Sequence, residues 1–264
     1  MNVYISMALS RVRSIAVFAF VAALAPLVSH GQQSSTTDLP WANAQQLVLV
    51  TTPDWEATRG TLRAFSRNGE AWEPVSGSVP VVIGRTGAAW GVGLHPPQPG
   101  IRKQEGDGRS PAGVFALGIA FGYANSAETG LPYEAMDAND YCIDVAASPL
   151  YNRIVDAAEV GADVVEGSTE PMRRDLHVDG DQRYKLGFVI QHNPGNEPGV
   201  GSCIFAHLWK SADVATAGCT AMAEPDMKKL LEWLTPKANP VFVLLPQPEY
   251  DALRVSWNLP TASE

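Results

Sequence analysis

The chain has 264 residues, of which 45% are hydrophobic and 18% are charged. This is the composition of a globular protein, and it excludes a disordered chain or a coiled coil. A net charge of −9 without any basic run argues against binding to nucleic acid, because phosphate backbones select basic surfaces.

The N-terminus has the pattern of a secretory signal peptide. Arg11 and Arg13 precede an apolar stretch over residues 15–25, and small residues precede a cut after Gly31. The stretch is shorter than the ~20 residues that a membrane-spanning helix needs. We therefore expect residues 1–31 to be removed, and the mature protein to work in the periplasm or cell envelope without a membrane span.

Most of the remaining chain has the pattern of β-strands. A polar linker is expected over residues 32–45, followed by runs of β-branched and alternating residues. Asn68-Gly69 separates two of these runs and is typical of a hairpin turn. The expected strands cover residues 45–52, 61–67, 71–75, 79–83, 113–118, 186–192, 202–207 and 241–245.

One helix is expected near the C-terminal end. Pro225 suits a first helical position, apolar residues follow at positions 227, 230, 231 and 234, and Pro236 ends the pattern. A second helix is expected within residues 148–160. No repeat or internal linker divides the body, so the sequence predicts one mainly β (α+β) domain over residues 46–264.

The sequence carries no recognisable metal or cofactor motif. Five histidines and three cysteines are spread along the chain, without Cys-x-x-Cys or His-Glu-x-x-His. The glycines within residues 106–113 are not followed by the Lys-Ser/Thr of a phosphate loop. We expect neither a metal nor a cofactor.

Cys219 has the surroundings of a nucleophile. It follows Gly218 in a run of small residues, so the N–H groups of Gly218, Cys219 and Thr220 are candidates for holding an oxyanion. A cysteine nucleophile also needs a base or cation, and His207 ends the preceding strand. The alternative is an unreactive buried thiol.

Two segments resemble a known family. Residues His207 to Cys219 resemble the active-site segment of the L,D-transpeptidase catalytic domain, the YkuD-like domain, which has a strand-borne histidine, a loop and a Ser/Thr-x-Gly-Cys turn. The stretch Arg102-Lys-Gln-Glu-Gly-Asp-Gly-Arg-Ser-Pro-Ala-Gly-Val-Phe115 resembles the upstream "GDGRTPEGxF" element of that family. The likeness covers roughly residues 46–246.

The resemblance implies a curved sheet or flattened β-barrel with a helix packed on it, acting on the stem peptides of peptidoglycan. Cys219 matches the nucleophile, His207 the general acid/base and Gly218 the turn glycine, and the Leu208 carbonyl matches the group that orients the imidazole. The implied pair is a thiolate and an imidazolium near neutral pH.

The resemblance also implies the reaction, which is L,D-transpeptidation through a cysteine thioester, with release of D-alanine and formation of a cross-link. The alternatives are a carboxypeptidase or amidase on the same scaffold, and a non-catalytic wall-binding module. Ala217 and Ala221 stand where many members have His and Arg, which leaves the substrate and the reaction subtype open.

The remaining candidates lie around this pair. Cys142 and Cys203 either form a disulfide or are two separate buried thiols; a disulfide would leave Cys219 as the free thiol. Three residues are candidates for substrate binding: His192, Trp209 and Thr220.

Overall fold

The computed structural model describes residues 39–75 and 77–261, together with Met1. The rest of the expected signal peptide and part of the expected linker lie outside this part of the chain. The strands within it are β1 (Gln46–Thr52), β2 (Arg59–Asn68), β3 (Ala71–Pro74), β4 (Val79–Val82), β5 (Ala88–Trp90), β6 (Ser110–Gly122), β7 (Tyr133–Ala135), β8 (Asp140–Cys142), β9 (Ile154–Asp156), β10 (Glu170–Pro171), β11 (Leu186–Ile190), β12 (Phe205–Leu208), β13 (Thr220–Met222) and β14 (Val241–Pro246). The helices are α1 (Ala157–Val160), α2 (Arg174–His177), α3 (Glu224–Trp233), the 3₁₀ turn η2 (Pro236–Ala238) and α4 (Gln247–Leu253).

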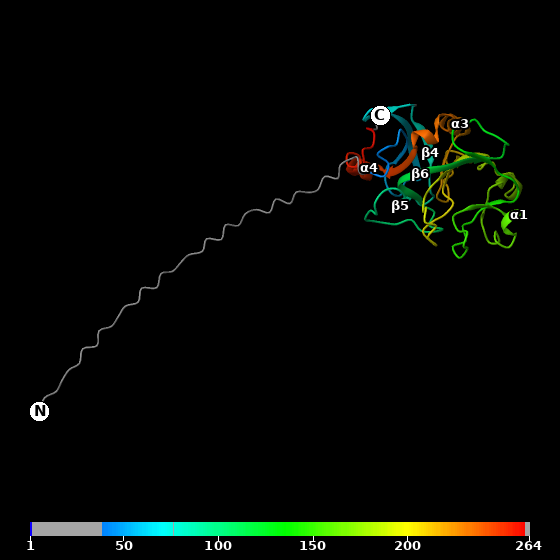
Figure 1. The fold of residues 1–264 in the computed structure, drawn as a ribbon, viewed down its shortest axis with the longest axis horizontal. Helices are drawn as coiled ribbons and strands as arrows, with labels where there is room; N and C mark the ends of the chain where they lie inside the picture. Colours follow the sequence, from blue (N-terminus) through cyan, green and yellow to red (C-terminus); the bar gives the residue numbers. More distant parts are fainter. Residues whose placement is uncertain (2–38, 76, 262–264) are drawn as a thin grey trace. The chain divides into compact units, whose positions relative to one another are not determined.

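Eight strands close into a mixed β-barrel, in the order β1-β14-β6-β11-β12-β13-β4-β2, with β2 hydrogen-bonded back to β1 (Figure 1). β3 extends this sheet as a hairpin with β2, and β5 and β7 pair with β6. The pairs β1–β14 and β12–β13 are parallel, whereas the other neighbours in the ring are antiparallel. Closure removes the free sheet edges of the eight ring strands.

The hydrophobic core fills the barrel and continues beneath two helices. β1 and β14 are buried at every position, because one face points into the barrel and α4 packs against both strands. α3 packs next to β11 and β12, and its apolar face of Met227, Leu230 and Leu231 is buried in the same core. The expected β-rich fold with a packed C-terminal-side helix is therefore confirmed.

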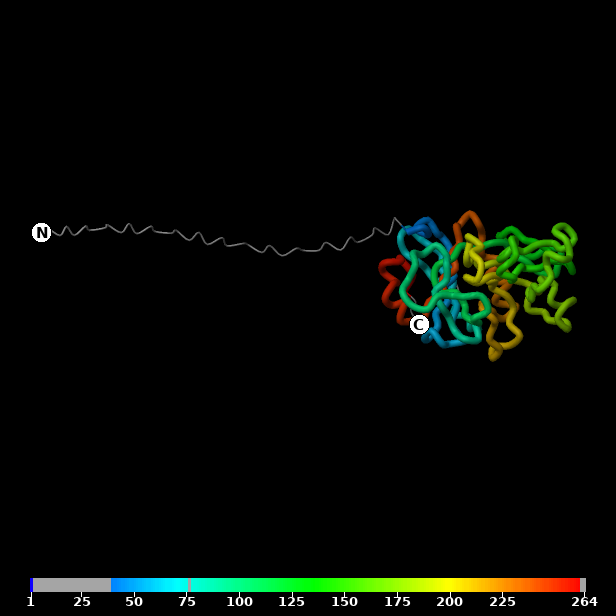
Figure 2. The backbone as a smooth tube through the Cα atoms, turned by 90° about the horizontal axis from the view of Figure 1, so that it is seen from below, coloured from blue at the N-terminus to red at the C-terminus, as the bar shows by residue number. Residues whose placement is uncertain are grey.

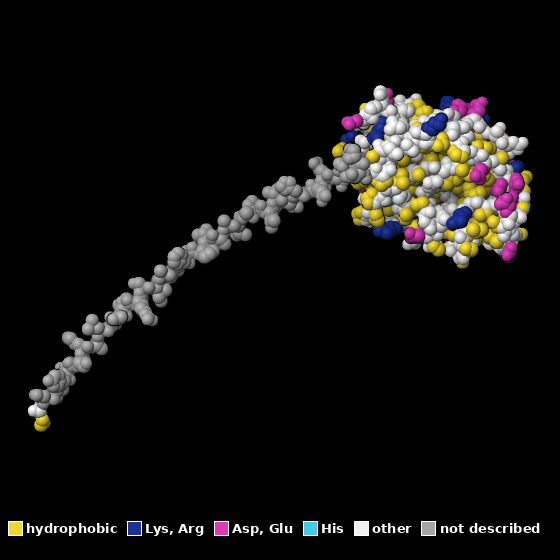
Figure 3. All heavy atoms as spheres, in the orientation of Figure 1, with side chains coloured by type: hydrophobic (Ala, Val, Ile, Leu, Met, Phe, Trp, Pro, Cys, Tyr) yellow, Lys and Arg dark blue, Asp and Glu magenta, His cyan; other side chains and the backbone are white. Residues whose placement is uncertain are grey.

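Residues 136–185 form a lobe beside the barrel. This lobe contains the three-stranded sheet β10-β8-β9 together with α1 and α2, and it lies at one end of the folded domain (Figure 2). It contains eleven acidic residues against five basic ones. Figure 3 shows acidic side chains gathered on the side of the molecule that carries α1. Much of the negative charge of the protein is therefore placed on the lobe.

The structure corrects one expected boundary. The expected linker over residues 32–45 ends earlier, because Trp41 and Ala44 are buried in the core and the Trp41 indole donates to Trp257 O at 3.0 Å. The second helix, expected over part of residues 148–160, is the short α1, which follows β9. In the described part of the chain, no helix is long and apolar enough to cross a membrane.

Candidate active site

Cys219 lies at the end of a turn that side-chain hydroxyls hold in place. Thr216 Oγ1 donates to the Cys219 carbonyl oxygen at 2.6 Å and accepts from the Gly218 N–H at 3.1 Å. A Cβ atom on Gly218 would lie 3.1 Å from the Arg109 carbonyl oxygen, so this close approach favours glycine. Because the Gly218 N–H is already engaged within the turn, only the other N–H groups of the expected oxyanion hole remain candidates.

Residues 106–110, which belong to the upstream segment of the resemblance, contact the same turn. The Ser110 hydroxyl lies 2.7 Å from the Gly218 carbonyl oxygen and 3.1 Å from that of Cys219, and it accepts from the Gly84 N–H at 3.0 Å. Asp107 fixes the segment itself by accepting from the Arg109 N–H at 2.9 Å. The two stretches that carry the family resemblance are therefore in direct contact.

The Cys219 thiol is buried, with 7% of the residue exposed. Its sulfur accepts from the Phe205 N–H at 3.3 Å and lies 3.5 Å from the Cys203 carbonyl oxygen, to which the thiol donates. Burial raises the pKa of the Cys219 thiol to about 12, and the charge of Glu170 acts in the same direction. Cys219 is thus a protonated thiol at neutral pH in this conformation.

His207 is oriented as the resemblance implies. Its Nδ1 lies 2.7 Å from the Leu208 carbonyl oxygen, and because a carbonyl only accepts, Nδ1 carries the proton and Nε2 carries the lone pair. Burial lowers the pKa of His207 to about 4. The imidazole is therefore neutral at pH 7 and has a nitrogen in the correct state to accept a proton.

The strand register places both side chains on one face of the sheet. Ala206 pairs with Thr220 and His207 with Ala221 in the parallel β12–β13 ladder. Because side chains alternate along a strand, Cys219 and His207 point to the face opposite Ala206 and Thr220. Among the hydrogen bonds of residues 39–75 and 77–261, none joins the two side chains. The expected thiolate–imidazolium pair is consequently not the state of this conformation, in which burial keeps both groups neutral.

A polar network from the lobe lies next to the pair. The Tyr184 ring packs edge-on against the His207 ring with centroids 5.1 Å apart, and its hydroxyl donates to Glu170 Oε2 at 2.6 Å. Arg174 bridges Glu170 and Asp181, with Nη1–Oε2 and Nε–Oδ2 distances of 3.4 and 3.0 Å. Burial alone would raise the pKa of Asp181, but hydrogen bonds from Arg183 and Arg174 hold it below its usual range.

Sequence reasoning missed this network because its residues come from the lobe, far from His207 and Cys219 along the chain. No local pattern marks Tyr184 as a neighbour of His207, and only the folding of the lobe brings the two rings together. The role of Ser110 had only a weak indication in the sequence, since this residue belongs to a segment that resembles the family.

The other expected site residues have different surroundings. His192 is buried, with Nδ1 accepting from the Val92 N–H at 3.2 Å and Nε2 lying 3.1 Å from Val200 O, so its ring is held by the main chain. Thr220 is 1% exposed and lies on the sheet face opposite Cys219, and its role in substrate binding stays a prediction. Trp209 is half-exposed directly after β12, and its role stays a prediction.

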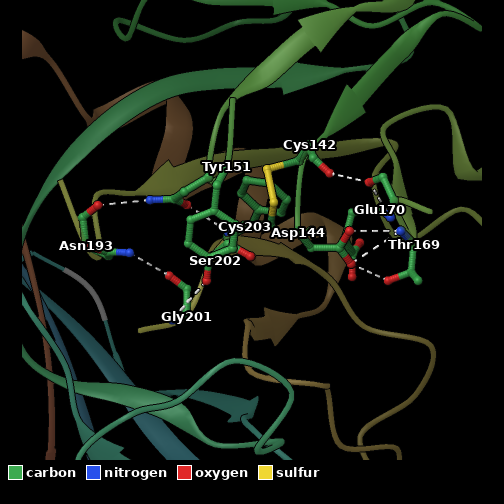
Figure 4. Close-up of a disulfide and its surroundings, with 12 residues drawn as sticks. Cys142, Asp144, Tyr151, Thr169, Glu170, Asn193, Gly201, Ser202 and Cys203 are labelled. Atoms are coloured by element: carbon green, nitrogen blue, oxygen red, sulfur yellow. Dashed lines mark hydrogen bonds between the residues drawn. A yellow bond between two sulfur atoms is a disulfide. The ribbon is translucent and has the colours of Figure 1, made fainter. Parts of the chain in front are cut away.

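Cys142 and Cys203 form the expected disulfide, with Cα atoms 5.9 Å apart. Figure 4 shows that the bond joins the lobe to the segment that leads into β12. Two hydrogen bonds cross the same junction. The Gly201 N–H donates to the Tyr151 hydroxyl at 3.1 Å, and the Cys203 N–H donates to Asn152 Oδ1 at 2.9 Å. Cys219 is the free cysteine.

Comparisons with protein-family models, with curated proteins and with solved structures found no match to this chain. The membership in the L,D-transpeptidase family therefore stays a prediction that rests on the two resembling segments.

Proposed function

We propose that this protein is an exported cysteine acyltransferase, of the L,D-transpeptidase type, that acts on peptidoglycan stem peptides. The observation that carries the proposal is the orientation of His207 by the Leu208 carbonyl, on the same sheet face as the only free cysteine among the described residues. Nucleophilic catalysis requires a base that can come within hydrogen-bond reach of a thiol, and a shared sheet face is compatible with that approach. The contact of Ser110 with the Cys219 turn supports it.

The proposed reaction has two acyl-transfer steps. His207 Nε2 takes the thiol proton, and the Cys219 sulfur attacks the carbonyl at the L-centre of the diamino acid. The carbon–nitrogen bond to D-alanine breaks as His207 returns the proton to the leaving amine, which leaves a thioester. An amine from a second stem then attacks the thioester, the carbon–sulfur bond breaks, and the thiol is regenerated with a new cross-link.

Burial of both groups sets a condition on this reaction. A substrate reaches Cys219 only when the lobe residues that cover it move, and entry of water or a polar substrate then lowers the desolvation that keeps the thiol protonated. The pair becomes reactive in that open state, while the closed state protects the thiol.

The proposal is tested by incubating the mature protein with purified muropeptides and identifying the products by mass spectrometry. We expect cross-linked dimers together with released D-alanine. Cys219→Ala and Cys219→Ser are expected to lose turnover, because neither replaces a thiol nucleophile. Monomers shortened by D-alanine without dimers would instead support a carboxypeptidase. Turnover by Cys219→Ala would contradict the covalent mechanism.

A further inference from the structure

A groove of about 600 Å³ approaches the thiol along the sheet face that carries it. Its apolar floor contains Ile119, Val189 and Phe205, from three adjacent strands of the barrel. Phe205 is also the residue whose N–H donates to Cys219 Sγ at 3.3 Å, and Cys203, which accepts from the thiol, belongs to the lining as well. The groove therefore ends beside the nucleophile, although Cys219 itself is not part of its lining.

Two opposite charges line this groove without a partner. Glu134 comes from β7, and Arg153 comes from the lobe just before β9. Both side chains are exposed, and within the described chain neither forms an ion pair or a side-chain hydrogen bond. Other arginines of the lobe, such as Arg173, Arg174 and Arg183, are paired with Asp175 or Asp181. The groove thus offers one cation and one anion to a ligand.

The position of His207 indicates which part of a substrate lies in the groove. The β12–β13 register places Cys219 level with Phe205. The groove is lined by Cys203, Ile204 and Phe205, whereas His207 lies two residues further along β12 and outside the lining. The leaving amine must meet His207, and by microscopic reversibility the acceptor amine takes the same place. The acyl half of the donor peptide is consequently expected to bind on the side of the thiol where the groove lies.

We infer that this groove binds the acyl half of the donor peptide, with Arg153 pairing with a carboxylate and Glu134 with the side-chain ammonium of the diamino acid. This inference rests on the proposed function and adds the donor subsite and its two charge contacts. A peptide with both charges on one short segment matches the unpaired charges of the groove, and the apolar floor contacts its aliphatic stems.

The inference is tested by calorimetric binding of donor peptides to Cys219→Ala protein, which cannot turn them over. The probes are L-Ala-γ-D-Glu-meso-diaminopimelyl-D-Ala, a form with the acyl-half carboxylates amidated, and a form with the side-chain amine acetylated. Arg153→Gln and Glu134→Gln are each added to the Cys219→Ala background. Arg63→Gln on β2 and Glu159→Gln on α1 are the matched controls, since both lie outside the groove lining.

We expect Arg153→Gln and Glu134→Gln each to raise the Kd of the unmodified peptide roughly three- to tenfold, the range of a partly exposed ion pair. Arg153→Gln is further expected to remove the preference over the amidated probe, and Glu134→Gln the preference over the acetylated probe. The groove assignment would be overturned if neither variant changed the Kd values or the preference over the modified probes. If the protein with an intact Cys219 still turned over the unmodified peptide, the proposed function would stand. A protein that neither binds nor turns over any probe would overturn both.

Discussion

Cys219 and His207, the proposed catalytic pair, lie in surroundings that keep both groups neutral. The thiol receives a main-chain hydrogen bond, and the imidazole has a fixed tautomer, but both are almost fully shielded from water. Burial disfavours the charged form of each group, which raises one pKa and lowers the other. At the residue scale, burial therefore keeps both groups neutral in this conformation.

The buried histidines make the stability of the protein depend on pH. Burial lowers the pKa of both His207 and His192 from 6.5 to about 4. Their contribution to stability is fully present above the unfolded pKa of about 6.5 and is lost as the pH falls towards 4. We expect acidification from pH 7.5 to 4.5 to lower the free energy of unfolding by roughly 2 kcal/mol for each histidine, measured by urea denaturation.

The variants that test this prediction are His192→Gln and His207→Gln. Each is expected to flatten the pH dependence of the free energy of unfolding, because the titrating ring is gone. An equal pH dependence in both variants and in the unaltered protein would show that burial of these rings does not control the acid response.

Sequence reasoning reached the residues that carry local signals. The Cys142–Cys203 disulfide was predicted from the expectation that the chain is exported, and it is confirmed. The roles of Cys219, Gly218 and His207, predicted from neighbouring residues, spacing and the family resemblance, stay predictions. Spacing along the chain did not show that the Thr220 side chain points to the sheet face opposite Cys219, because that orientation is set by the strand register.

At the element scale, α3 and eight strands were predictable because each carries its own local pattern; these strands are β1, β2, β3, β4, β6, β11, β12 and β14. The short strands β5, β7, β8, β9, β10 and β13 were not predicted. The Asn68-Gly69 hairpin pairs as expected, with Asn68 opposite Ala71. The parallel pairing of β12 with β13 was not predictable, since a short strand of small residues has no distinctive pattern. That pairing is nevertheless what sets the relative positions of His207 and Cys219.

The disulfide joins two elements whose separation would uncover the thiol. Replacing both cysteines by serine removes the link between the lobe and the segment before β12, across a sequence separation of 61 residues. We expect a loss of stability of up to roughly 4 kcal/mol, and several-fold faster alkylation of Cys219 by iodoacetamide in the folded protein. Alkylation is followed by peptide mass spectrometry.

Alkylation reports on Cys219 alone, because it is the only cysteine outside the disulfide and the serine variant has no other thiol. The same variant with Cys219→Ala is the labelling control and should take up no reagent. An alkylation rate equal to that of the unaltered protein would show that the tether does not restrict access to the thiol.

At the scale of the whole molecule, the barrel carries the proposed catalytic pair and the lobe covers it. The barrel strands hold Cys219 and His207 on one face, and Tyr184 and Glu170 of the lobe lie over that face. The mainly β class was predictable from composition and strand patterns, whereas the lobe was not. Its short elements, such as α2 and β10, depend on contacts with the rest of the fold rather than on local periodicity.

The central claim, that Cys219 forms a thioester with a stem peptide, is tested most directly by locating the acyl adduct with peptide mass spectrometry. The mature protein is mixed with the tetrapeptide donor without an acceptor amine, quenched in acid, and mapped by peptide mass spectrometry. We predict an acyl adduct on Cys219, absent in Cys219→Ala and formed about 10²–10⁴-fold more slowly in His207→Ala. Release of D-alanine with no adduct on Cys219, or with the adduct on another residue, would contradict the account.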